Sequence, residues 1–321
     1  MSNAAIRMEQ LILPTYPEPG KEEMPLFSEH RVHQRSTGRP YPNKVTLEVN
    51  RERKIERSYT VVHLENEYLD VLVLPEIGGR IFAARDKVTD YDFFYRQHVI
   101  KPGLIGALGS WISGGVEFNW PYHHRPSGFL PCDFETEECG DGSVICWLSE
   151  HDPIDRMKGM VGIVLKPGCA YLETRVKLCN RTPVTKSFLW WENAAVPVNE
   201  SYQIFFPKDV TYVNFHYLDS RISYPIAGDA TFNGIDMTTP RDISWHKNTK
   251  DATSYFACAS QYDFFGGYDH GLDCGVVHIG DHHISPGKKM FTWAYNQLSK
   301  TWENTLTDTD GQYAELMAGS Y

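Results

Sequence analysis

Short runs that alternate between apolar and polar residues recur along most of the chain, and Gly, Pro, Asn and Asp separate them. This period of two is typical of β-strands with one buried face, whereas helical periodicity is almost absent. The predicted strands fall at residues 45–49, 59–65, 68–75 and 79–86, then at 143–150, 160–166, 170–180 and 186–196, and finally at 255–260, 274–280, 290–296 and 312–319. Many short strands with turn residues between them predict an all-β fold, namely a large antiparallel two-sheet sandwich with few helices. The exposed edges of such large sheets favour a homodimer.

Two segments interrupt this rhythm. Residues 1–43 are rich in proline and polar residues, and we expect them to form an N-terminal extension that packs along a sandwich domain at 44–321. Residues 98–140 form a long connection without clear alternation, and a connection of this length is uncommon in a compact domain unless it has a function. Because a strand pattern runs almost to Tyr321, we also expect the sandwich to be truncated at its C-terminus, with the natural chain continuing beyond it.

The composition limits the classes of partner. Hydrophobic residues make up 41% and charged residues 22% of the 321 residues, which is ordinary for a globular protein that buries a sizeable core. The net charge of -10 argues against nucleic acid and anionic membranes as partners, because both require basic patches. The high aromatic content of 13% suits strands and also rings that stack on sugars.

The same sequence predicts a cytoplasmic protein. No apolar stretch approaches the roughly 20 residues of a membrane span, and the N-terminal residues lack the basic and apolar regions of a secretory signal. The seven cysteines are odd in number and include no CxxC motif. We therefore expect reduced thiols and no disulfide bond.

The run GGVEFNWPYHHRPSG, inside the long connection, concentrates polar groups of different chemistry. Its glycines and prolines favour a rigid loop, and rigid loops often carry binding groups. Glu117 is a candidate general acid or base, and His123 and His124 can donate, accept or carry charge near neutral pH. Arg125 can hydrogen-bond two hydroxyls, and Trp120 offers a flat apolar face. This mixture suits a polyhydroxylated ligand, and the alternative is that these groups satisfy one another in a buried corner.

Two strand patterns add further candidates. Trp191 and Asn193 share one face of the predicted strand at 186–196, where an aromatic ring beside an amide suits a sugar, although paired tryptophans also fill sandwich cores. Glu315 stands in an otherwise buried run, and a carboxyl group in such surroundings has a raised pKa that suits proton transfer. The alternative for Glu315 is a structural ion pair with Arg80 or Arg125.

No metal site and no cofactor are predicted. The adjacent pairs His123–His124 and His282–His283 would each point to opposite faces of an extended segment and could not easily bind one ion together. The sequence contains no HExxH zinc motif, GxSxG nucleophile elbow, P-loop or GxGxxG dinucleotide motif. Hydride transfer and phosphoryl transfer are therefore not expected.

The runs LPEIGGRI, GGVEFNWPYHHRP, FLWWEN and SPGKKMFTW resemble an uncharacterised bacterial domain family that is found ahead of tetratricopeptide repeats. The similarity extends from about Leu11 to Tyr321, and LPEIGGRI is also similar to a strand-turn-strand segment of aldose-epimerase-like proteins. The resemblance implies a galactose-mutarotase-like super-sandwich whose concave face binds carbohydrate, with tetratricopeptide repeats following in the full-length protein. It implies no established reaction.

Three functions remain open within carbohydrate recognition. The first is a carbohydrate-active enzyme, a glycosidase or a lyase acting on oligosaccharides, in which Glu117 and Glu315 converge on one pocket. The second is an isomerase of the aldose epimerase or mutarotase type, in which His123 and Glu315 exchange protons with the sugar. The third is a sugar-binding module without catalysis. The side chains expected to bind the substrate are Arg80, Trp120, His124, Arg125, Trp191 and Asn193.

Overall fold

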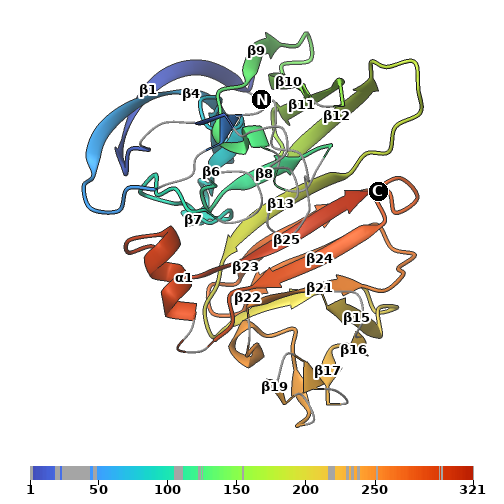
Figure 1. Cartoon of the computed structure of the whole chain (residues 1–321). Coiled ribbons are helices and arrows are strands. Elements are labelled where there is room, and N and C mark those ends of the chain that lie inside the picture. The colour runs from blue at the N-terminus through green and yellow to red at the C-terminus, as the bar shows by residue number, and fades with distance from the viewer. Residues whose placement is uncertain are drawn as a thin grey trace. The chain divides into compact units, whose positions relative to one another are not determined.

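The structure, a computed structural model, describes residues 3–18, 22–23, 44–45, 49–104, 111–121, 124, 126–153, 155–215, 221–228, 231–232, 235–236, 239–250, 252–295, 297 and 299–320. The chain divides into two compact units, Met1–Trp190 and Trp191–Ser320. Figure 1 shows the strands of both units. The predicted boundary between an extension at 1–43 and a sandwich at 44–321 stays a prediction.

The first unit consists of antiparallel strands. Its elements are β1 (Ala5–Thr15), β2 (Glu22–Glu23), β3 (Lys44–Val45), β4 (Ile55–Glu65), β5 (Leu69–Leu74), β6 (Arg80–Asp86), β7 (Tyr91–Asp92), β8 (Val116–Asn119), the 3-10 helix η3 (Pro126–Phe129), β9 (Asp133–Glu138), β10 (Val144–His151), β11 (Met157–Leu165) and β12 (Leu172–Asn180). Strands β1, β4, β5, β6 and β8 are neighbours in this order, with β7 on β6. Strands β9 to β12 form a separate meander, and β2 pairs with β3.

Strand β1 lies where the sequence predicted only an extension. It pairs with β4 over its whole length, from Ala5 opposite Glu65 to Thr15 opposite Ile55. Most side chains of β1 are exposed or half-buried, so the strand shows little of the apolar alternation that reveals a buried face. Pairing with β4, rather than a hydrophobic pattern, therefore makes this segment a strand.

The segment at 98–140 is not the irregular connection that the sequence predicted, because it contains two strands. All four residues of β8 are buried, so this strand has no polar face to alternate with an apolar one. All six residues of β9 are exposed, which hides that strand for the opposite reason. Both patterns depart from the half-buried strand that alternation detects.

The core of the first unit combines strands that are distant in sequence. One cluster of buried side chains comprises Leu13, Tyr59, Val61, Leu74, Ile77, Phe82, Ala83, Ile100 and Ile112. Burying a large aliphatic or aromatic side chain of this kind contributes about 1.5–3 kcal/mol. The cluster therefore fixes β1, β4, β5 and β6 as one sheet.

The second unit has more strands and a short helix. Its elements are β13 (Trp190–Pro197, which begins at the last residue of the first unit), β14 (Tyr202–Phe205), β15 (Tyr212–Phe215), β16 (Arg221–Ser223), β17 (Ile226–Ala227), β18 (Thr231–Phe232), β19 (Ile235–Asp236), β20 (Arg241–Asp242), the 3-10 helix η4 (His246–Asn248), β21 (Thr253–Ala257), β22 (Phe264–Asp269), β23 (Cys274–Ile279), β24 (Gly287–Thr292), α1 (Ser299–Leu306) and β25 (Tyr313–Ser320). Its main sheet has the order β13-β25-β24-β21-β15-β16, and β14, β22 and β23 form a second sheet.

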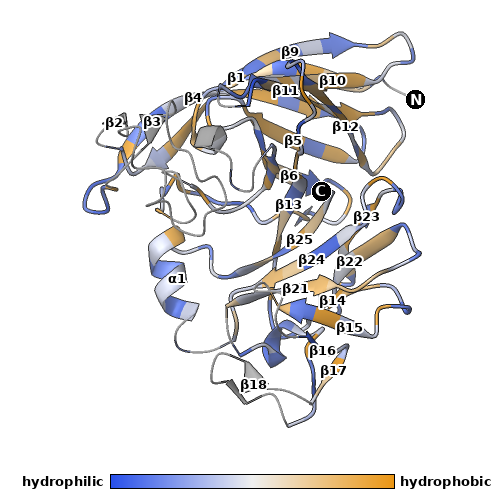
Figure 2. Cartoon of the chain, turned by 45° about the vertical axis from the view of Figure 1, so that its right-hand side comes forward, coloured by the Kyte–Doolittle hydropathy of each residue, from blue (hydrophilic) through white to orange (hydrophobic). Residues whose placement is uncertain are grey.

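The two sheets of the second unit share one apolar core. Tyr202 and Ile204 of β14 belong to the same buried cluster as Tyr255 of β21, Met290 of β24 and Leu316 of β25. Alternation along each strand places these residues on the inner faces, as in a sandwich. The helix α1 is mostly hydrophilic (Figure 2).

These observations confirm the predicted all-β, antiparallel fold with few helices. Within the described residues, no helix combines the length and the apolar character needed to cross a membrane. All seven cysteines are free thiols in the structure.

Candidate active site

The turn between β5 and β6 contacts the segment after β8 through backbone atoms. Gly78 has a positive φ of 67°, and its N–H donates a hydrogen bond to the carbonyl oxygen of Leu130 at 2.8 Å. A Cβ atom on Gly78 would lie 2.3 Å from the carbonyl oxygen of Gly128. Because no side chain fits there, the LPEIGGRI turn requires glycine at this point.

A second glycine sets the start of β8. Gly115 has a φ of 63°, and a Cβ atom on it would lie 1.9 Å from the carbonyl oxygen of Ile81. The next residue, Val116, pairs with Ile81 of β6. This close approach places the side chain of Glu117, one residue further on, beside β6.

Glu117 and His124 form a buried pair. The Nδ1 atom of His124 lies 3.2 Å from Oε1 and 3.1 Å from Oε2 of Glu117. The residue Glu117 is only 6% exposed, and burial by itself would raise its pKa. The charge and hydrogen bond of His124, followed by the charge of Arg80, outweigh burial and hold the pKa of Glu117 well below its ordinary value. Glu117 is therefore ionised at neutral pH.

Arg80 supports this pair from β6. Its guanidinium is buried, and Nη1 donates hydrogen bonds to the carbonyl oxygens of Ile112 at 2.8 Å and Gly114 at 3.0 Å. Asn119, one strand period after Glu117, also hydrogen-bonds the carboxylate and lowers its pKa. Two neighbours thus stabilise the negative charge of Glu117 independently of His124.

The conformation of His124 fits a functional position. Its φ is 49°, in the left-handed region that costs a non-glycine residue about 1 kcal/mol or more. Its side chain is 18% exposed, and its ring meets the ring of Trp111 edge-on with centroids 5.9 Å apart. An ionised carboxylate only accepts hydrogen bonds, so Nδ1–H of His124 donates to Glu117. This fixes the tautomer and leaves Nε2 able to accept or donate a proton.

Trp120 lies on the other face of the same segment. Its ring packs against Gly159 of β11 so closely that a Cβ atom there would be 2.1 Å away. Trp120 and Phe118 line a small pocket with Gly78, Cys132 and residues of β10 and β11. The pocket has room for about one water molecule. Trp120 thus packs between β8 and β11, apart from the Glu117–His124 pair. His123 and Arg125 lie outside the described residues.

The second unit carries the predicted residues Trp191 and Glu315 on its main sheet. Trp191 meets Phe256 edge-on, with ring centroids 6.1 Å apart. The Nζ atom of Lys289 lies 4.8 Å from the centroid of Phe256 and 6.0 Å from that of Trp191. Lys289 is opposite Met317, and Phe291, two residues further along β24, is opposite Glu315. Because residues two apart share a face, Glu315 lies on the same face as Lys289.

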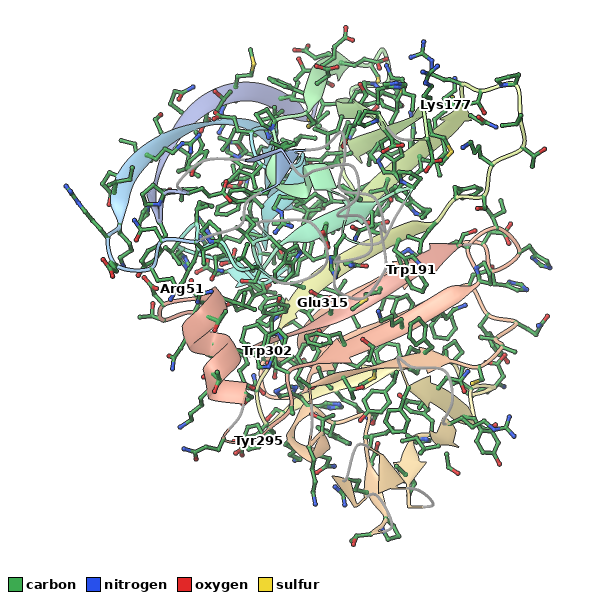
Figure 3. All side chains as sticks on the ribbon, in the orientation of Figure 1. Arg51, Lys177, Trp191, Tyr295, Trp302 and Glu315 are labelled. Carbon is green, nitrogen blue, oxygen red and sulfur yellow. The ribbon has the colours of Figure 1, made fainter. Side chains whose placement is uncertain are left out.

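This face gathers aromatic, amide and charged side chains on neighbouring strands. Asn193 lies two residues after Trp191 on β13, so the two side chains share one face, as the sequence predicted. Both residues are buried. Figure 3 labels Trp191 on β13 and Glu315 on the adjacent strand β25. Phe256 and Lys289 were not among the residues predicted from the sequence, although the alternation Gly287, Lys289, Phe291 on β24 was available as a signal.

The structure does not bring every candidate together in one described site. Arg80, Glu117 and His124 meet in the first unit, whereas Glu315 and its neighbours belong to the second. Convergence of Glu117 and Glu315 on one pocket stays a prediction.

The sequence interpretation of His282 and His283 was wrong. We placed them on opposite faces of an extended segment, but they lie in a turn between β23 and β24. Their ring centroids are 3.9 Å apart. A turn removes the alternation of directions on which the prediction rested.

The fold and these sites define a β-sandwich protein with a galactose mutarotase-like fold. The chain belongs to the family described as a domain of unknown function, DUF5107, whose model matches residues 37–321. The predicted resemblance to an uncharacterised family with a mutarotase-like sandwich is therefore confirmed.

Two solved structures are similar to this chain. A TPR-domain containing protein from Parabacteroides distasonis ATCC 8503 matches with a TM-score of 0.82 and 22% identity, over 99% of this chain and 51% of that protein. This chain thus spans about half the length of that relative. A galactose mutarotase-like protein from Lactobacillus casei ATCC 334 matches with a TM-score of 0.51 and 9% identity, over 81% of this chain and 87% of that one. At these identities the likeness concerns the fold.

Proposed function

We propose that this protein is a carbohydrate-active enzyme that transfers a proton at a bound sugar, with His124 as the acid–base group and Glu117 as the residue that orients it. The observation that carries the proposal is the buried Glu117–His124 hydrogen bond, with an ionised carboxylate on one side and a partly exposed imidazole on the other. A mutarotase-like sandwich supports a carbohydrate as the substrate class by analogy of fold.

The ionisation of Glu117 limits its role in a glycosidase, which needs one protonated and one ionised carboxyl group. A glycosidase needs a protonated carboxyl group with a raised pKa as its general acid. The pKa of Glu117 is instead lowered, so this side chain does not suit that role. Proton transfer by His124, as an isomerase of the epimerase or mutarotase type or a lyase requires, fits the pair better.

The proposed step starts with His124 as the imidazolium whose charge helps to hold Glu117 ionised. Its Nδ1–H stays bonded to Glu117, and Nε2–H donates its proton to the sugar, for example to the ring oxygen. The neutral Nε2 atom then accepts a proton from the sugar, for example from the anomeric hydroxyl, and this restores the imidazolium. The adjacent carboxylate stabilises the charged form, in the manner of other acid–base histidines that are held by a carboxylate.

A non-catalytic sugar-binding module is the second candidate. The observation that favours it is the face of the second unit where Trp191, Phe256 and Lys289 lie together with Asn193 and Glu315. Aromatic rings beside polar groups suit the apolar face and the hydroxyls of a sugar.

A screen of reducing sugars and oligosaccharides for both binding and turnover separates the candidates. Anomer exchange is followed by NMR line broadening, and cleavage or elimination by product analysis. His124→Gln should lower turnover by about 100-fold or more while sugar binding persists. The matched control is His151→Gln, because His151 is an exposed histidine at the end of β10.

Two outcomes would count against the proposal. Sugar binding without any product would favour the binding module. Turnover that survives His124→Gln unchanged would assign the proton transfer to another residue.

A further inference from the structure

The turn between β23 and β24 gathers metal-ligating side chains. One potential ligand atom from each of Asp281, His282 and His283 lies within 4.8 Å of the other two. The side chain of His282 is 16% exposed and that of His283 is 76% exposed, so an ion can reach them from solvent. The turn belongs to the second unit, and the inference drawn from it does not depend on the function proposed for His124.

Each imidazole of this turn is held by a carboxylate through the same ring nitrogen. The Nδ1 atom of His282 lies 2.7 Å from Oδ1 of Asp263, and the Nδ1 atom of His283 lies 3.0 Å from Oδ1 of Asp281. The backbone N–H of each histidine donates to the same carboxylate oxygen as its ring does. A carboxylate at one nitrogen fixes the tautomer and makes the other nitrogen a better metal ligand, which is the usual arrangement around metal-binding histidines.

The charges of the turn also favour a cation. Asp263 accepts hydrogen bonds from the backbone and side chain of His282, and Asp281 accepts them from the backbone and side chain of His283. Within the described residues, no basic residue other than these histidines hydrogen-bonds either carboxylate. Two anionic groups next to two imidazoles offset the charge of a divalent ion.

The donor atoms select a class of metal. Imidazole nitrogen with a carboxylate suits zinc, nickel, cobalt or copper, whereas calcium and magnesium prefer oxygen ligands alone. Ligand atoms of a tetrahedral zinc site are about 3.4 Å apart, so atoms that lie within 4.8 Å of one another need to approach by at most about 1.4 Å on binding. Rotation of the exposed side chain of His283 can supply this movement, because its ring is held by a single carboxylate.

We propose that Asp281, His282 and His283 bind a divalent transition-metal ion, and that Asp263 is the positioning residue that orients His282. If the two histidines only cap the turn, the protein has no affinity for metal at this point.

Isothermal titration of the tag-free, reduced and metal-free protein with Ni²⁺ alone tests the site, and Co²⁺ absorption identifies the donors. We expect one saturable ion per chain and a Co²⁺ spectrum without a thiolate band, which matters because the chain has seven free cysteines. The double variant His282→Ala/His283→Ala should lose at least about 100-fold in affinity, and Asp263→Asn about 10-fold, since orienting carboxylates contribute roughly 10–100-fold.

The matched control is His151→Ala, which removes an exposed histidine elsewhere and should leave affinity unchanged. Thermal unfolding without metal should be the same for all variants, so that lost affinity is not lost folding, and Ni²⁺ should raise the midpoint only where the site is intact. Absence of saturable binding, an unchanged affinity in the double variant, or a thiolate band would each overturn the proposal.

Discussion

Replacing the buried Lys288 by methionine should stabilise the protein. Lys288 lies on β24 opposite Ala318, and its side chain is on the face that Met290 contributes to the apolar core. The residue is only 4% exposed, and within the part of the chain that the structure describes its Nζ atom has no hydrogen-bond partner. Burial lowers the pKa of Lys288, and the more distant charges of Asp209 and Asp263 offset this only in part.

The magnitude follows from removing a desolvated ammonium group without removing its packing. Exchanging buried ionic groups for well-packed apolar side chains of similar volume is neutral or stabilises proteins by about 1–4 kcal/mol. Methionine matches lysine in length and adapts to irregular spaces. We therefore expect Lys288→Met to raise the free energy of unfolding by about 2 kcal/mol.

The neighbouring residue Lys289 provides a control, because Lys289→Met should lower the free energy of unfolding. Lys289 lies on the other face of β24, with Nζ over the rings of Phe256 and Trp191. Lys289→Met removes these cation–π contacts, which contribute about 0.5–2 kcal/mol. The two substitutions are chemically identical and adjacent, so a difference in sign reports the environment of each ammonium group.

The assay is urea unfolding of both variants at several pH values. The pKa of Lys288 is lower in the folded than in the unfolded protein, so unfolding takes up a proton between the two values. The destabilisation by Lys288 is therefore complete below the folded pKa and shrinks as the pH rises toward the unfolded value of about 10.4. A Lys288→Met variant that is less stable than the parent, or whose advantage does not shrink toward pH 10, would refute the reasoning.

Four further outcomes are expected. Burial and the charge of Lys288 lower the pKa of His278 from 6.5 to about 4, so stability should fall as the pH falls through this window, and His278→Gln should reduce that slope in urea titrations. Gly115→Ala should destabilise the protein by about 3 kcal/mol or more because its Cβ meets a carbonyl oxygen, whereas Gly140→Ala, which has open space, should change stability by less than about 1 kcal/mol. Glu315→Gln should leave turnover by His124 largely unchanged, because the proposed step does not use Glu315; loss of turnover with binding intact would instead favour the pair of Glu117 and Glu315, and unfolding would indicate a structural role. Thiol titration of the unfolded, unreduced protein should find seven thiols, and a lower number would contradict the reduced state.

Local patterns in the sequence located many of the longer strands and the shared face of Trp191 and Asn193, but they missed β14 to β20 and β22. Alternation located β4, β5, β6 and the strands of the later groups, because a strand with one buried face repeats every two residues. The same period placed Trp191 and Asn193 together. The glycines of LPEIGGRI marked a turn, and the structure explains them by backbone contact at Gly78.

The sequence by itself determined the all-β class, the strand periodicity and the chemistry of the candidate side chains. Tertiary structure decided which of them meet: the approach of Gly115 to β6 and the left-handed backbone of His124 create its pair with Glu117. Register decided that Lys289 and Glu315 share a face, and a turn brought two histidines together that alternation would have separated. Side-chain period is a local property of the backbone, whereas register, turn conformation and the burial of a whole strand such as β8 depend on partners far away in sequence.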